Sequence, residues 1–315
     1  MIIACATDDN FIQHCSVMLT SLFENNKKED IVVYLLTEGL KEISQRYIKN
    51  IELIYKCKIQ ICNINIALLN DFPLFPGDHV SIVTYFRLLL PDIIDNKISK
   101  ILYLDSDIII TGSLKPLWDI KLTAPIAAVP ESTSYQPENY KRLQYDSKYS
   151  YFNAGVILIN LEYWRSHQLI DRFRDYLIKY PERVRWHDQD ILNAVLHNNW
   201  LRLPIRWNAL EGYFHTSFYR NTKLNKKNKI EIINEITNPI IVHYCAKNKP
   251  WCWGNNHPLK NLYFTYLEKT EWKYYNPKLT ISKDNIKIII RNILVLLRIK
   301  KTLFINIQQK DNNQI

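Results

Sequence analysis

The chain reads Ile101-Leu-Tyr-Leu-Asp-Ser-Asp-Ile-Ile-Ile110 about one third of the way along its length. Four apolar residues before Asp105 are typical of a buried strand, and the three isoleucines after Asp107 continue it. Side chains two residues apart in a strand share a face, so both carboxylates can bind one divalent cation. Open α/β sheets bind ligands at the carboxyl ends of their strands. The stretch therefore predicts an α/β fold with a cation site, the alternative being a solvated turn.

Short apolar runs alternate with longer segments of helical periodicity on both sides of this stretch. Continuous apolar runs such as 31–36 indicate strands that are buried on both faces, as in a mainly parallel sheet. Ser81 is expected to cap a helix that Pro91 stops. We expect strands at 2–6, 31–36, 58–64, 101–104, 108–110, 126–129, 156–159 and 240–244, and helices at 15–23, 42–55, 81–90, 161–180 and 190–196.

The composition narrows the function classes. The 315 residues, 47% hydrophobic and 23% charged, suit one large domain or one domain with an appendage and exclude a disordered chain. With six glycines and neither GxGxxG nor GxxxxGK[ST], dinucleotide dehydrogenases and P-loop enzymes are disfavoured. Twenty tyrosines and eight tryptophans offer aromatic platforms for sugars or bases.

Positive charge gathers near the C-terminus. Residues 270–315 hold nine lysines and arginines against three acidic residues, more than half of the net charge of +10. Lys283, Lys287, Arg291, Arg298 and Lys301 fall within a helical stripe roughly 80° wide. The longest charge-free run in this segment is far shorter than the ~20 residues that span a bilayer, so the helix would lie on an anionic membrane surface. A helix docked on the domain is the alternative. This local tail argues against nucleic-acid binding across the whole molecule.

The N-terminus MIIACATDDN has no basic segment before a long apolar stretch, so we do not read it as a signal peptide and expect the chain in the cytoplasm. The six cysteines lack CxxC spacing, and we expect reduced thiols without a chemical role. Two domains are expected: a catalytic domain at 1–265 and a basic membrane-association region at 266–315.

A histidine and a lysine follow the predicted strand at 240–242. His243 is placed to complete a metal shell as a nitrogen ligand, and Lys249 to neutralise a phosphate. Alone, His243 would be read as a structural histidine. Together with the two carboxylates, it favours a metal site that binds a diphosphate ligand.

Six motifs follow one another along the chain: Ala4-Cys-Ala-Thr-Asp8-Asp-Asn10, Thr84-Tyr-Phe-Arg87-Leu, Leu102-Tyr-Leu-Asp105-Ser-Asp107, Tyr151-Phe-Asn153-Ala-Gly155-Val, His187-Asp188-Gln189-Asp190-Ile-Leu-Asn193 and His243-Tyr-Cys...Lys249-Pro-Trp. In this order they resemble glycosyltransferase family 8, in particular the bacterial lipopolysaccharide and lipooligosaccharide galactosyl- and glucosyltransferases. The resemblance covers about 1–251, and the basic tail is similar to the C-terminus of those enzymes.

The resemblance implies a GT-A fold, with a single mainly parallel mixed sheet flanked by helices. It implies retaining, metal-dependent transfer of a hexose from UDP-glucose or UDP-galactose to a lipid-linked oligosaccharide. The same resemblance implies a role for each site residue. Uridine is contacted by Ala6, Asp8 and Asn10, the Mn²⁺ or Mg²⁺ ion is bound by Asp105, Asp107 and His243, and the diphosphate is bound by Lys249. The donor site is completed by Arg87, Ser106 and Asn153, and the catalytic residues beside the sugar are Asp188 and Gln189.

Structural roles are open for several of these residues. Asp8 could begin a helix, Arg87 could be a surface charge, Asn153 a turn residue and Asp188 a helix cap. Retention requires a covalent adduct, on Asp188 or Gln189, or attack on the face of the departing phosphate. We favour same-face attack, in which a UDP oxygen takes the acceptor proton.

The sequence departs from the family pattern at two positions. Ala246 stands where these enzymes commonly have glycine, and Glu131 stands near the place of an acceptor-contacting aspartate. Residues 132–151 and 211–229 are expected to form acceptor walls. A protein, glycogen-type or capsular acceptor and a non-catalytic nucleotide-sugar-binding membrane protein are the rival functions. Glucose and galactose cannot be told apart from residue types.

Overall fold

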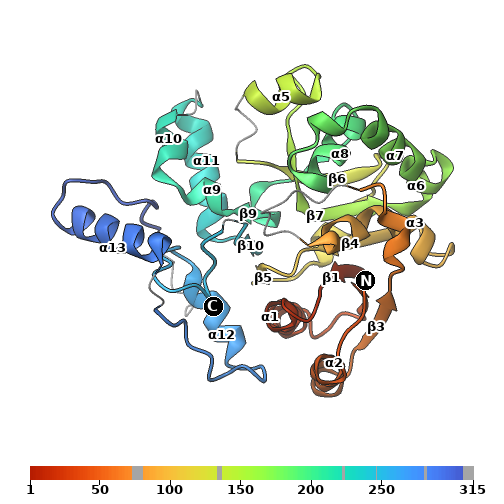
Figure 1. The fold of residues 1–315 in the computed structure, drawn as a ribbon, viewed down its shortest axis with the longest axis horizontal. Coiled ribbons are helices and arrows are strands. Elements are labelled where there is room, and N and C mark those ends of the chain that lie inside the picture. Colours follow the sequence, from red (N-terminus) through yellow and green to blue (C-terminus); the bar gives the residue numbers. More distant parts are fainter. Residues whose placement is uncertain (73–80, 133–136, 222–223, 246, 280–281, 308–315) are drawn as a thin grey trace.

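The computed structural model describes the chain except residues 73–80, 133–136, 222–223, 246, 280–281 and 308–315 (Figure 1). Its described residues form a seven-stranded mixed sheet, in which β7 is antiparallel to both of its neighbours and the other pairs are parallel. This confirms the α/β fold with a mainly parallel sheet. In spatial order the strands are β3 (Lys58–Asn63), β2 (Val32–Thr37), β1 (Ile2–Ala6), β4 (Lys100–Leu104), β7 (Phe152–Asn160), β6 (Ile126–Pro130) and β8 (Leu201–Arg202).

A second, three-stranded sheet adds to the single sheet expected. Strand β10 (Ile241–His243) pairs antiparallel with β5 (Ile108–Ile110) and parallel with β9 (Ala209–Leu210). The apolar run at 101–110 is therefore two strands in two sheets rather than one continuous strand. The three residues between them, 105–107, lie where the chain passes from one sheet to the other.

The large sheet is buried on both faces. In β1, Ile3 and Cys5 belong to one apolar core, and Ala4 and Ala6 belong to the other. This matches the continuous apolar strands of a doubly covered sheet. Helices α1 (Ile12–Asn25) and α2 (Glu42–Tyr55) cover one face, and α6 (Leu161–Ser166), α7 (Leu169–Lys179) and α8 (His187–Leu196) cover the opposite face (Figure 1).

The remaining helices are mostly short. They are α3 (Leu90–Ile93), α4 (Lys115–Trp118), α5 (Pro137–Leu143), α9 (Glu211–Phe214), α10 (Thr216–Asn221), α11 (Lys226–Thr237), α12 (Lys260–Leu267), α13 (Lys283–Leu296) and the 3-10 helices η1 (Ile66–Leu69), η2 (Ile82–Leu89), η3 (Pro181–Arg183) and η4 (Ile205–Trp207).

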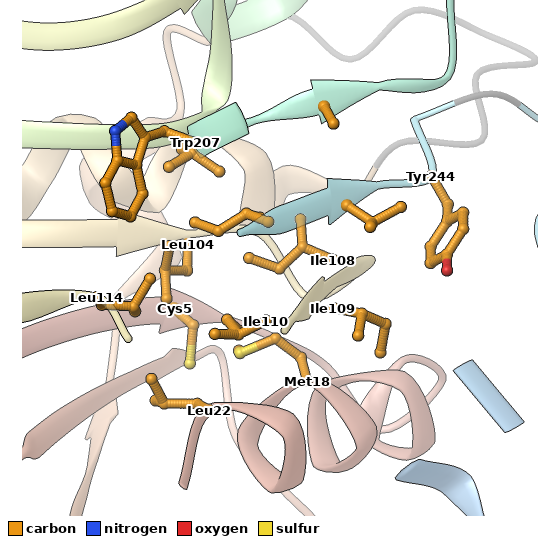
Figure 2. Close-up of a cluster of buried hydrophobic side chains, with 14 of the residues drawn as sticks. Cys5, Met18, Leu22, Leu104, Ile108, Ile109, Ile110, Leu114, Trp207 and Tyr244 are labelled. Carbon is orange, nitrogen blue, oxygen red and sulfur yellow. The ribbon is translucent and has the colours of Figure 1, made fainter. Parts of the chain in front are cut away.

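The isoleucines of β5 anchor the small sheet on α1. Ile108, Ile109 and Ile110 are all buried in the same core as Met18 and Leu22 of α1 (Figure 2). Burying three branched side chains side by side stabilises the fold by several kcal/mol, at about 1.5–3 kcal/mol each. This anchoring holds the preceding acidic residues in a defined place.

Two predicted helices differ from the structure. The segment at 81–90 is the 3-10 helix η2, capped by Ser81 as expected, but Pro91 does not stop a helix and instead lies in the first turn of α3. Proline is tolerated there because first-turn N–H groups have no partner within the helix. The helix predicted at 161–180 is divided into α6 and α7 at Gln168, whose φ is 49°.

The C-terminal segment forms an amphipathic helix that leaves apolar side chains in solvent. This helix, α13, ends at Leu296, and Arg298 has a φ of 59°, so Arg298 and Lys301 of the predicted helical stripe lie beyond the helix. Helix α13 lies at one side of the molecule (Figure 1), with Leu296 81% exposed and Ile293 49% exposed. The chain then returns to the domain, where Phe304 forms a β-bridge with His215 and packs against His257. The expected domain boundary at 265/266 falls within α12. Among the described residues, no helix has the length and apolarity needed to span a bilayer.

Candidate active site

The order of the strands places a site at the carboxyl ends of β1 and β4. The chain runs outward from β1 to β2 and β3, and returns to β4 on the other side of β1. Ligands bind at such reversals because the loops diverge there. Ser106 joins the two strand ends, since its hydroxyl donates to the Ala6 carbonyl over 2.8 Å.

Asp105, Asp107 and His243 converge at this edge. Pairing of His243 with Ile108 across the small sheet brings the imidazole next to the acidic residues. His243 Nε2 lies 3.2 Å from Asp107 Oδ1 and 3.8 Å from Asp105 Oδ2. One ligand atom from each of the three residues lies within 4.8 Å of the others. Carboxylate oxygens and an imidazole nitrogen suit Mn²⁺ or Mg²⁺, so the predicted metal ligands form a set that fits a divalent cation.

Gly155 leaves the space that this cluster occupies. A Cβ at that position would lie 2.3 Å from His243 Cε1 and 2.5 Å from Asp105 Oδ2. Only glycine lets the β7 backbone approach the three side chains this closely.

The charges in the cluster compensate one another. Burial raises the pKa of Asp107, but Lys249 and His243 outweigh it and hold that pKa well below its usual range. Burial lowers the pKa of His243, but Asp107 and Asp105 outweigh it and raise that pKa above its usual value. Lys249 Nζ donates to Asp107 Oδ2 over 2.6 Å, so the lysine predicted for a phosphate lies beside the predicted metal ligands.

Trp251 fixes the loop that carries Lys249 against α1. Its ring stacks on His14 with centroids 3.6 Å apart and 15° between the planes. Burial lowers the pKa of His14 to about 3, so this ring is neutral at physiological pH. Ala246, in the same loop, lies outside the described residues.

Arg87 lies beneath the site rather than on the surface. It is only 4% exposed, and its guanidinium bridges Asp105 Oδ1 and Asp188 Oδ2, each at 2.9 Å. Thr84 donates to Asp188 Oδ1 over 2.6 Å. Burial raises the pKa of Asp188, although Arg87 and Thr84 oppose that rise. The surface-charge interpretation of Arg87 and the helix-cap interpretation of Asp188 are therefore wrong.

Asn153 and Gln189 form an amide pair next to these carboxylates. Asn153 lies inside β7 rather than in a turn, and its Nδ2 donates to Gln189 Oε1 (3.1 Å) and Glu131 Oε2 (2.9 Å). Gln189 Oε1 also accepts from the Ala154 N–H at 3.0 Å, and its Nε2 donates to the Tyr151 hydroxyl.

The residues predicted for the nucleotide follow β1. Ala6 ends the strand, and Asp8 Oδ1 accepts from the N–H groups of Asn10 and Phe11, both at 2.9 Å. Asp8 thus shapes the turn before α1, as its structural interpretation expects, while Asn10 is exposed. A turn-forming role leaves the second carboxylate oxygen of Asp8 available to a ligand.

Sequence reasoning missed two buried polar residues at this site. Asn208, between η4 and β9, hydrogen-bonds Asn153 and His243. Asp190 accepts from Arg142, from the Tyr151 hydroxyl and from two N–H groups at the start of α8. Asp190 lay inside a quoted motif, whereas no local pattern marked Asn208.

Comparisons with known proteins show the family of the chain. Residues 2–253 match the family model described as Glycosyl transferase family 8. General stress protein A of Bacillus subtilis (strain 168) is 29% identical over 275 residues, which cover 86% of this chain and 94% of that protein. The lipopolysaccharide glucosyltransferase WaaO of Escherichia coli (strain K12) is 28% identical over 280 residues, 86% of this chain and 78% of that protein.

A solved structure supports the fold. The crystal structure of the galactosyltransferase LgtC in complex with donor and acceptor sugar analogues matches with a TM-score of 0.77 at 24% identity. The match covers 91% of this chain and 100% of that chain. It confirms the expected fold.

Proposed function

The chain belongs to glycosyltransferase family 8, and on that ground we propose that it transfers glucose or galactose from a UDP-sugar to a lipopolysaccharide or lipooligosaccharide core, with retention of configuration. One observation carries the proposal. Two carboxylates and an imidazole converge beside an ammonium group at the carboxyl edge of the sheet. That set offers ligands for a cation and positive charge for a diphosphate.

Asp105, Asp107 and His243 would hold Mn²⁺ or Mg²⁺. A cation held by these residues would supply Lewis-acid stabilisation of the negative charge on departing UDP. Lys249, which neutralises Asp107 in this structure, would become available to the diphosphate once a cation neutralises that carboxylate.

The donor sugar would lie against Asp188, Asn153 and Gln189. Arg87 serves this site by holding Asp105 and Asp188 in place through its two ion pairs. Uridine would contact Ala6, Asp8 and Asn10 at the end of β1, and Ser106 keeps that end next to the metal ligands.

The surroundings of Asp188 and Gln189 support same-face attack. Thr84 donates to one oxygen of Asp188, while the other oxygen has no hydrogen-bond partner among the described residues and forms an ion pair with Arg87. That ion pair stabilises the carboxylate charge, which lowers its nucleophilicity. Gln189 is a neutral amide whose Oε1 accepts from two N–H groups, and such an oxygen is a weak nucleophile. In same-face attack the acceptor oxygen bonds to the anomeric carbon as the bond to phosphate breaks, and UDP takes the acceptor proton. A glycosyl adduct on either residue, detected by mass spectrometry, would contradict this mechanism.

The two segments expected as acceptor walls start next to each other. A Cβ at Gly212 would lie 2.0 Å from the Ser132 Oγ, and the Tyr213 hydroxyl donates to the Pro130 carbonyl over 2.8 Å. Glu131, which directly precedes Ser132, accepts a hydrogen bond from Asn153 of the amide pair. The lipopolysaccharide acceptor of WaaO supports the same acceptor class here. Protein, glycogen-type or capsular acceptors would be identified by an acceptor panel.

The first test is release of UDP from UDP-glucose, UDP-galactose and UDP-N-acetylglucosamine, with Mn²⁺ and with EDTA. We expect EDTA-sensitive release from one hexose donor, and transfer when a lipooligosaccharide core is added. Folded protein that neither releases UDP nor binds it in the presence of Mn²⁺ would contradict the proposal and favour another role.

A matched pair of variants assigns the activity to the site. Asp107→Ala is expected to reduce transfer at least 100-fold, because it removes a metal ligand. Asp119→Ala removes an exposed carboxylate that pairs with Lys115 on α4 and should leave transfer unchanged. Equal activity of both variants would place the metal elsewhere.

We also propose that α13 holds the enzyme on the inner face of the cytoplasmic membrane. Its exposed apolar side chains and the basic residues near them are the composition of a helix that lies in an anionic lipid surface. Deleting the tail would also expose the surface that Phe304 covers, so charge reversal in the full chain is the cleaner test. Lys287→Glu with Arg291→Glu, both on α13, should weaken flotation with phosphatidylglycerol vesicles about tenfold or more, at about 1 kcal/mol per charge.

The control for this prediction is Lys226→Glu with Lys227→Glu, an exposed basic pair on α11. It changes the net charge equally but leaves the amphipathic helix intact. Equal vesicle binding by the two double variants would contradict a specific role of the tail.

A further inference from the structure

A buried asparagine outside every sequence motif connects the metal-ligand cluster to the amide pair. Asn208 is 0% exposed, and both ends of its side chain are engaged. Its Nδ2 donates to Asn153 Oδ1 over 2.8 Å, and its Oδ1 lies 2.9 Å from His243 Nδ1. A buried amide with both ends satisfied holds its neighbours in a defined orientation.

The orientation of this network follows from one backbone group. The Gly155 N–H donates to Asn153 at 2.9 Å, and a backbone N–H can only donate, so the atom that accepts is Oδ1 of Asn153. That oxygen also faces Asn208, which must therefore present its NH₂ group there. The other end of Asn208, which faces His243, is an oxygen that can only accept.

The proton of the imidazole is thereby placed. Because Asn208 Oδ1 accepts, His243 Nδ1 must carry a hydrogen, and in the neutral ring the lone pair is on Nε2. Nε2 is the nitrogen that faces Asp107 and Asp105. A histidine binds a metal through an unprotonated nitrogen, here Nε2, and a hydrogen-bond partner on the other ring nitrogen is the usual way to fix that tautomer.

We propose that Asn208 is a positioning residue of the metal site, which sets the tautomer of His243 and, through Asn153, aligns the amide of Gln189. The inference rests on the proposed function, since it assumes that His243 binds a cation. It deepens that function by adding a residue that touches neither metal nor substrate. It also connects cation binding to the donor-sugar side of the site through one chain of hydrogen bonds.

Two substitutions separate the two ends of Asn208. Asn208→Asp retains an acceptor for His243 Nδ1 but loses the donor to Asn153 Oδ1. Asn208→Leu, of similar size, removes both. Asn26→Leu is the matched control, because Asn26 is also buried and hydrogen-bonded at both ends, but to Leu22 and Leu114 away from the site.

Mn²⁺ affinity is measured with UDP present, from the electron paramagnetic resonance signal of free Mn²⁺. We expect about 10–100-fold weaker binding in Asn208→Leu. Asn208→Asp should bind Mn²⁺ at least as tightly as the wild type, yet lose at least tenfold in kcat, with KM for the donor changed less. Asn26→Leu should lose stability but keep Mn²⁺ affinity.

Normal Mn²⁺ affinity in folded Asn208→Leu would overturn the inference. Equal losses of Mn²⁺ affinity in Asn208→Asp and Asn208→Leu would also overturn it. If Asn208→Leu does not fold, long-range ¹H–¹⁵N spectra of the wild type with Mg²⁺ and UDP decide instead: an Nδ1–H, Nε2-unprotonated His243 supports the inference and the opposite tautomer overturns it. A wild type without Mn²⁺ binding or UDP release would instead remove the proposed function, and the inference with it.

Discussion

Asp190 shows how single buried polar residues organise this site. It is 0% exposed and accepts from both terminal nitrogens of Arg142, at 2.6 and 2.9 Å, and from the Tyr151 hydroxyl at 2.8 Å. Because the carboxylate can only accept, the Tyr151 proton points toward it. The tyrosine oxygen is then free to accept from Gln189 Nε2. The buried Asp190 carboxylate thus orients the Gln189 amide through the Tyr151 hydroxyl.

This arrangement makes a prediction for Tyr151→Phe. The change removes the acceptor of Gln189 Nε2, so kcat should fall about tenfold while KM for the donor changes less. The expected loss of stability is about 1 kcal/mol, the usual value of one hydrogen bond. Steady-state kinetics with urea unfolding measure both.

Tyr145→Phe is the control for that change. Among the described residues, the buried Tyr145 hydroxyl has no hydrogen-bond partner, although the ring belongs to the same small cluster as Tyr151. Its removal should affect neither kcat nor stability appreciably. A Tyr151→Phe enzyme with wild-type kcat would show that Gln189 does not depend on this hydroxyl.

At the scale of elements, short pieces of structure carry the site residues. Helix η2 delivers Thr84 and Arg87 to Asp188 of α8, and β5 with β10 delivers His243 to Asp107. These elements have few internal hydrogen bonds, so tertiary packing and caps decide whether they form. A substitution that weakens an element without touching the site should therefore still alter function.

Ser81→Ala is such a substitution. Ser81 Oγ accepts from the Val83 N–H at the start of η2, and the loss of a cap costs about 1 kcal/mol. Since η2 holds Arg87, we expect KM for the donor to rise about two- to fivefold, as measured by UDP release.

The comparison for Ser81→Ala is Asn160→Ala, which removes the cap of α6 on the Tyr163 N–H. It should cost similar stability but leave KM unchanged, because α6 carries none of the site residues. Parallel effects of the two variants on KM would mean that overall stability, and not the placement of η2, controls donor binding.

At the scale of the whole molecule, histidines buried without charge connect stability to pH. Burial lowers the pKa of both His14 and His257 to about 3 from the ordinary 6.5. Between these pH values the unfolded chain binds one more proton at each histidine than the folded chain. Stability therefore decreases as pH falls from about 6.5 toward 3, by up to about 1.4 kcal/mol per pH unit and histidine.

His257→Phe tests this dependence. The ring packs against Phe214, Tyr244 and Phe304, so phenylalanine retains this packing. It loses the hydrogen bond that the Leu259 N–H donates to His257 Nδ1, which lowers stability about equally at every pH above 3. The free energy of unfolding is measured in urea at pH 7.5, 6.0 and 5.0. In the variant its slope against pH should be smaller by about 1.4 kcal/mol per pH unit below pH 6.5, which corresponds to one proton fewer. An unchanged slope would show that His257 does not contribute to acid destabilisation.

Local patterns were sufficient for most strands and marked the three residues that we predict as metal ligands. The apolar runs at 2–6, 101–104 and 108–110 are strands, because residues that are buried on both faces leave a continuous apolar signal. The carboxylates and His243 were recognisable because each directly follows or ends such a run. Their assembly depends on the pairing of β10 with β5 in the second sheet, which brings His243 next to Asp107.

Other features depended on contacts between distant residues. The division of 101–110 between two sheets needed the pairing of β5 with β10, more than 130 positions further along the chain. Pro91 lies in the first turn of α3, and Gln168 divides α6 from α7, which differs from the helices predicted at 81–90 and 161–180. Local periodicity in the sequence does not indicate such strand pairings and helix boundaries.

Neighbouring residues encode the α/β class, the strand-end carboxylates, the family motifs and the amphipathic tail, so these features can be read from the chain alone. The buried roles of Arg87, Asp190 and Asn208 became visible in the folded molecule. Asn208 meets residues 55 and 35 positions away. An isolated polar residue has no periodicity, and its role comes from the geometry of partners that folding brings to it.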